Sequence, residues 1–126
     1  MVRESLNANS RLAGICVLKG TLNSLAFIHR TTTGALAEYS GFRPLLDEPV
    51  SLRIEQDANG HFLGSYKQSN TDGFVGIGNE QIGFTEGHLG YAVASGTGGD
   101  NDDPGTIPTS VAFQNDICGV TVSPTR

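Results

Sequence analysis

The sequence predicts an all-β protein: a single-domain, up-and-down antiparallel β-barrel of about eight strands, with a β-sandwich as the alternative. Apolar residues alternate with polar ones at a period of two, as they do in half-buried strands. Turn signals rich in glycine recur at short intervals between the alternating segments. No window past residue 15 has the i, i+3, i+4, i+7 spacing of apolar residues that an amphipathic helix needs.

The elements follow in chain order. Residues 1–11 are predicted to form an N-terminal extension, and residues 12–126 the single barrel domain. In the clearest strand, Val50, Leu52 and Ile54 are expected on the core face, opposite the intervening polar residues. The segments that alternate in this way are residues 25–30, 50–55, 88–94, 110–114 and 118–122.

A faint internal repeat supports a series of hairpins. Gly34, Gly60 and Gly87 are 26 and 27 residues apart, and each precedes a segment that contains a tyrosine. A turn glycine supplies the positive φ that tight hairpins require. We therefore expect about one hairpin per repeat, with a fourth over residues 107–122 after a loop at 95–107.

Composition and charge exclude several classes of protein. The 126 residues carry 8 Lys and Arg against 13 Asp and Glu, a net charge of −5, without the basic surface of a nucleic-acid-binding protein. No apolar run approaches the roughly 20 residues of a membrane-spanning helix. No apolar run follows the N-terminal charges, so we expect no signal peptide in this chain, and the localisation stays open. Nucleic acid and membrane are not expected as partners.

Metal and cofactor sites are not predicted either. The three histidines lack the spacing of known metal motifs. The acidic loop at residues 96–105 could offer oxygen ligands to calcium, but Pro104 breaks the pattern of a calcium-binding loop. A solvated connection is the simpler interpretation of this loop.

The two cysteines leave two interpretations open. In an oxidising compartment, Cys16 and Cys118 could join the first strand to the last through a disulfide. Alternatively, both are buried small apolar side chains, because a free cysteine packs like a hydrophobic residue.

Two hairpin segments carry a resemblance to a known family. The segment Leu22-Asn23-Ser24, followed by Gly34-Ala35-Leu36 and Tyr39, resembles the opening hairpin of the avidin–streptavidin family of small, calycin-type, biotin-binding β-barrels. The segment from Asn59-Gly60 to Ser65-Tyr66 is similar to the same hairpin. The resemblance implies a pocket at one barrel end that includes Ser24, Tyr39 and Tyr66. That family encloses biotin with tryptophans and this chain has none, so biotin is not the expected ligand.

The expected function is to bind a compact organic molecule in the barrel end, without assigned catalytic residues. Tyrosines would provide apolar walls with hydroxyl groups, and a few polar side chains would orient the ligand. The predicted ligand-binding residues are Ser24, His29, Arg30, Tyr39, Tyr66 and Tyr91.

Two other functions stay open, a carbohydrate-binding lectin and a cofactor-free isomerase or cyclase. Binding is preferred to catalysis because the sequence lacks Gly-x-Ser-x-Gly and any other nucleophile motif. The expected partners are a small organic ligand or a sugar. A homo-oligomer is also expected to be possible, because the repeated strands can pair along their edges.

Overall fold

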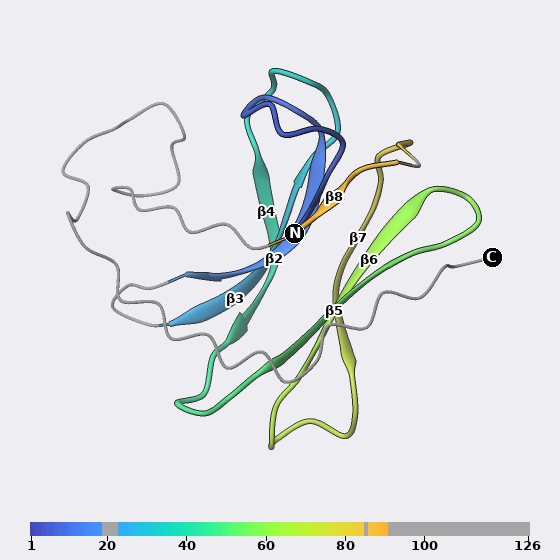
Figure 1. The fold of residues 1–126 in the computed structure, drawn as a ribbon. Helices are drawn as coiled ribbons and strands as arrows, with labels where there is room; N and C mark the ends of the chain where they lie inside the picture. Colours follow the sequence, from blue (N-terminus) through green and yellow to red (C-terminus); the bar gives the residue numbers. More distant parts are fainter. Residues whose placement is uncertain (19–22, 85, 91–126) are drawn as a thin grey trace, which may run out of the picture. The chain divides into compact units, whose positions relative to one another are not determined.

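The computed structural model describes residues 1–18, 23–84 and 86–90, all within the compact unit Met1–Gly90. The all-β prediction is confirmed: these residues form strands and turns and contain no helix (Figure 1). Accordingly, no helix among them has the length and hydrophobicity needed to cross a membrane. The strands are β1 (Val2–Arg3), β2 (Leu12–Leu18), β3 (Ser24–Arg30), β4 (Glu38–Pro44), β5 (Ser51–Gln56), β6 (His61–Lys67), β7 (Val75–Gln81) and β8 (His88–Leu89).

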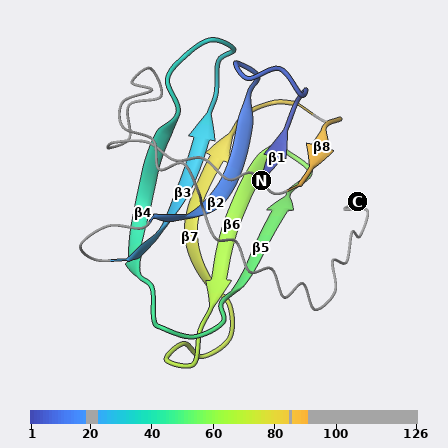
Figure 2. The same cartoon turned by 60° about the vertical axis from the view of Figure 1, so that its left-hand side comes forward.

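The strands make two antiparallel sheets. One has the order β4-β3-β2-β1-β8 and the other the order β5-β6-β7 (Figure 2). Within the described ranges the two sheets are not hydrogen-bonded into a closed barrel, so this part of the chain matches the sandwich alternative. The predicted strands at 110–114 and 118–122, the loop at 96–105, Cys118 and Tyr91 lie outside the described residues.

The hairpin between β5 and β6 follows directly from its turn residues. Gly60 has a φ of 81°, as expected for a turn glycine. The Asp57 carboxylate accepts hydrogen bonds from the backbone N–H groups of Asn59 at 2.8 Å and His61 at 3.0 Å. The hydrogen bond from His61, and to a smaller extent that from Asn59, lowers the pKa of Asp57, because both bonds stabilise the charged carboxylate.

The core lies between the two sheets and is centred on Phe27, which is fully buried. Its ring lies against Gly64 of β6 and Gly78 of β7, which are directly opposite each other in the three-stranded sheet. Two glycines side by side leave a hollow in the sheet surface, and the ring of Phe27 fills it. The buried hydrophobic cluster comprises Ala13, Leu25, Phe27, Phe62, Tyr66, Ile77, Ile82 and Phe84.

A glycine also allows β4 to approach β7 closely. Gly41 has a φ of 66° and lies where the register between β3 and β4 shifts. A Cβ atom at this position would overlap the backbone carbonyl of Ile77. The backbones of β4 and β7 are therefore in direct contact, although the two strands belong to different sheets.

Residues 1–11, predicted as an N-terminal extension, contribute β1 to the five-stranded sheet. Val2 lies opposite Ala13 of β2 on one side and opposite Leu89 of β8 on the other. The Met1 carbonyl also accepts a hydrogen bond of 3.0 Å from the N–H of Gly90. The start of the chain thus joins β8 to the rest of the sheet.

Candidate functional site

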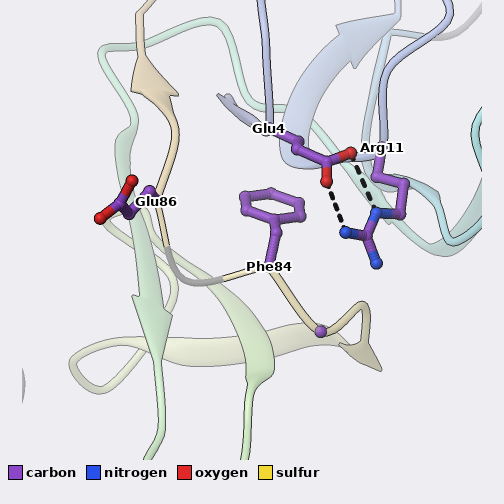
Figure 3. A pocket seen from close by; sticks show the side chains of 5 residues that line it. Glu4, Arg11, Phe84 and Glu86 are labelled. Atoms are coloured by element: carbon purple, nitrogen blue, oxygen red, sulfur yellow. Dashed lines mark hydrogen bonds and ion pairs between the residues drawn. The ribbon is translucent and has the colours of Figure 1, made fainter.

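An open depression of about 400 Å³ lies beside the hairpin formed by β1 and β2. Its lining comes from two parts of the chain: Glu4 and Arg11 from that hairpin, and Gly83, Phe84 and Glu86 from the segment after β7. Figure 3 shows Glu4 and Arg11 facing each other on one side of the Phe84 ring and Glu86 on the opposite side.

The hairpin register places Glu4 directly opposite Arg11. The N–H of Glu4 donates to the Arg11 carbonyl at 3.0 Å, which continues the ladder between β1 and β2 by one step. Residues directly opposite in an antiparallel ladder have their side chains on the same face. The two charged side chains are therefore held together by the backbone.

The Arg11 guanidinium uses all three of its nitrogens. Its Nε donates to Glu4 Oε2 at 3.0 Å, its Nη2 donates to Glu4 Oε1, and its Nη1 donates to the Ile82 carbonyl at 2.9 Å. A two-pronged pair of this kind fixes the orientation of both groups. About a third of each side chain stays exposed (28% for Arg11 and 33% for Glu4), so the pair is accessible from the depression.

The floor of the depression is firmly packed. Phe84 is 5% exposed, and its ring centroid lies 4.8 Å from that of Phe62 in the core. The Phe84 carbonyl accepts a hydrogen bond of 2.6 Å from the side-chain amide of Gln56 in β5. The Arg11 guanidinium carbon lies 5.8 Å from the centre of the Phe84 ring. The Arg11 guanidinium thus lies over a buried and well-packed aromatic ring.

Hydrogen bonding by the Arg11 side chain lowers the pKa of Glu4. Replacement of Arg11 with glutamine should return the Glu4 pKa towards its ordinary value of 4.5, because both the hydrogen bonds and the positive charge are weakened or lost. A carbon-detected NMR titration of the Glu4 carboxyl group measures this change directly. Asp57 serves as the control, since its own pKa is lowered by backbone N–H groups that the substitution leaves in place.

The sign of the linked effect on stability follows from the same shift. A carboxyl group with a lowered pKa in the folded state stabilises that state above its ordinary pKa. This contribution is lost as the pH falls from 4.5 through the lowered value. An unchanged Glu4 titration in the Arg11→Gln variant would show that the pair does not form in solution.

The predicted site residues on β3 lie at its two ends. Ser24 begins the strand and is half-buried, whereas His29 and Arg30 end it and are both buried. Arg30 donates to the carbonyls of Ala8 at 2.7 Å and Ser10 at 3.2 Å. These hydrogen bonds from the buried Arg30 side chain therefore hold the turn between β1 and β2 against the end of β3.

His29 lies on the core side of β3. Its ring stacks on Phe27 at a centroid distance of 5.7 Å, and its Nδ1 has no hydrogen-bond partner among the described residues.

The structure does not bring the two described tyrosines together. Tyr66 belongs to the buried cluster between the sheets. Tyr39 of β4 lies opposite Ile28 of β3 in the ladder, and so on the face of the five-stranded sheet that points away from the Phe27 ring. Burial, and secondarily the nearby thiol of Cys16, raises the pKa of the half-buried Tyr39. The third predicted tyrosine, Tyr91, is outside the described residues.

Glu4 and Arg11 were not predicted as site residues, although the sequence carries a signal for them. Opposite charges at these two positions are symmetrically placed about a turn rich in Ser and Asn at residues 5–10. Read as a hairpin, this segment would have predicted a cross-strand ion pair. Because residues 1–11 were assigned to an extension, this ion pair was not predicted.

Comparison with known proteins leaves this site to be interpreted from its own chemistry: no family model, no curated protein and no solved structure matches the chain.

Proposed function

We propose that the protein is a non-enzymatic binding module that takes a compact, uncharged, hydroxyl-rich organic molecule, such as a sugar, in the depression beside Glu4 and Arg11. The observation that carries the proposal is the two-pronged Glu4–Arg11 pair, which is accessible beside the packed ring of Phe84. The proposal keeps the binding role expected from the sequence and locates it at the β1–β2 hairpin.

The charge of the site favours an uncharged ligand. Glu4 and Arg11 neutralise each other, so a strongly charged ligand would have to compete with a pair that is already well formed. Glu86 adds a negative charge at the rim, which disfavours anions. A hydroxyl group can donate to a carboxylate oxygen and accept from a guanidinium, and so suits the pair without separating it.

Titration of the protein with glucose, galactose and mannose, followed by NMR, tests the proposal. We expect saturable shifts in the backbone amide signals of Glu4, Gly83 and Phe84 with at least one of these sugars, because these residues line the depression. Sodium acetate and methylammonium chloride, at equal concentration, should give smaller shifts.

Two variants separate binding in the depression from weak surface contacts. Glu4→Gln should weaken the binding of the active sugar at least about tenfold, because it removes a charged acceptor. The matched control is Glu55→Gln, which changes a second Glu–Arg pair, that with Arg53, on a different sheet. The absence of saturable shifts with all three sugars, or equal binding by both variants, would contradict the proposal.

A further inference from the structure

Strand β5 is an edge strand of the three-stranded sheet. Its partner on one side is β6, and no strand of the described ranges is hydrogen-bonded to its other side. Its sequence, Ser51-Leu52-Arg53-Ile54-Glu55-Gln56, contains no proline or glycine that would prevent further pairing. Within the described ranges, this edge of the sheet can therefore accept a further strand.

The side chains of β5 divide between the two faces of the sheet. Ile54 is partly buried and packs against the core, and Leu52, on the same face, is 44% exposed. Arg53 and Glu55 lie on the opposite face, where their side chains form an ion pair of 3.3 Å. The Arg53 guanidinium also lies over the ring of Phe74, 4.3 Å from its centre.

We propose that two copies of this chain associate by antiparallel pairing of β5 with β5, which joins the two three-stranded sheets into one. The inference does not depend on the proposed binding function. A two-fold axis perpendicular to the sheet and centred on Ile54 places Arg53 of each copy opposite Glu55 of the other.

The charge pattern selects this register over its neighbours. A shift of the centre by one residue puts Arg53 opposite Arg53, or Glu55 opposite Glu55, and like charges directly opposite each other are destabilising. The preferred register therefore has two complementary charge pairs on one face. On the other face it brings the exposed Leu52 of each copy alongside the second copy, which shields apolar surface from water.

Sedimentation analysis of the whole chain over a range of concentrations tests the association. We expect the wild-type protein to form a dimer. Arg53→Glu and Glu55→Arg should each raise the dimer dissociation constant about tenfold or more, because either change makes both charge pairs repulsive. An equimolar mixture of the two variants should restore the dimer, since every facing pair is then again of opposite charge.

Controls separate pairing from effects on folding. Lys67→Glu, an exposed charge reversal on the neighbouring strand β6, should leave the dimer unchanged. The double variant Arg53→Glu/Glu55→Arg keeps opposite charges within and between chains, and it should dimerise even if one of the single variants fails to fold. A monomeric wild-type protein, dimers unaffected by both single changes, or a double variant that stays monomeric would each overturn the proposal.

Discussion

Replacing Gly78 with alanine should lower the free energy of unfolding by about 3 kcal/mol, at the upper end of the usual cost of overpacking a core. The added methyl group would overlap the Cβ and ring atoms of Phe27. That ring cannot move aside easily, because Phe27 is fully buried and the neighbouring strand β6 also offers no space: a Cβ at Gly64 would lie 2.7 Å from the ring. The two sheets would have to separate, or the ring would have to leave its hollow.

Urea denaturation at neutral pH measures the effect. Gly76→Ala is the matched control in the same strand, since a Cβ atom there would meet nothing within 4 Å. It should be neutral or slightly stabilising, because alanine reduces the freedom of the unfolded chain. Similar losses in Gly76→Ala and Gly78→Ala would mean that strand conformation, rather than contact with Phe27, limits the residues allowed in β7.

Gly41→Ala is expected to destabilise the protein by a comparable amount, about 3 kcal/mol, for two separable reasons. The first is conformational: a φ of 66° costs a non-glycine residue roughly 1–2 kcal/mol. The second is steric, because the methyl group would overlap the carbonyl of Ile77, a backbone atom that no rotamer change can displace.

Gly34→Ala isolates the conformational part. Gly34 has a φ of 83°, and a Cβ atom there would have no neighbour within 4 Å. We therefore expect Gly34→Ala to cost only the roughly 1–2 kcal/mol of the strained backbone. Thermal and urea unfolding of both variants should show the larger loss for Gly41→Ala. Equal losses would argue against the close approach of β4 and β7.

Local patterns predicted the hairpins well and the relation between the sheets poorly. The alternation at residues 50–55 and the Asn59-Gly60 turn correctly indicated β5, its turn and β6, because turn chemistry and side-chain period are local properties. Leu52 was expected in the core but is exposed, since its strand lies at a sheet edge. Alternation shows which residues share a face, but not whether another strand covers the end of that face.

The candidate site was harder to predict because burial and pairing decide it. Arg30 was expected to orient a ligand, but in the structure its charge is used on backbone carbonyls of the turn between β1 and β2. Composition and spacing cannot show this, because the turn lies about 20 residues earlier in the chain. Interpreting residues 1–18 as a hairpin would have predicted the pair of Arg11 and Glu4. The position of Phe84 beside this pair could not be predicted, because only the packing of the sheets brings it there.

The position of β1 between β2 and β8 has a consequence for the order of folding. Among the described residues, most ladders join consecutive strands and close short loops, but the pairing of Val2 with Leu89 spans nearly the whole described chain. Contacts between residues so far apart in sequence form slowly, because the chain loses much entropy before the contact is gained. During synthesis, β1 and β2 can pair at once, whereas the other edge of β1 stays open until residue 89 has been added. For that interval the nascent chain carries an unpaired strand edge, which is a site of association with other chains.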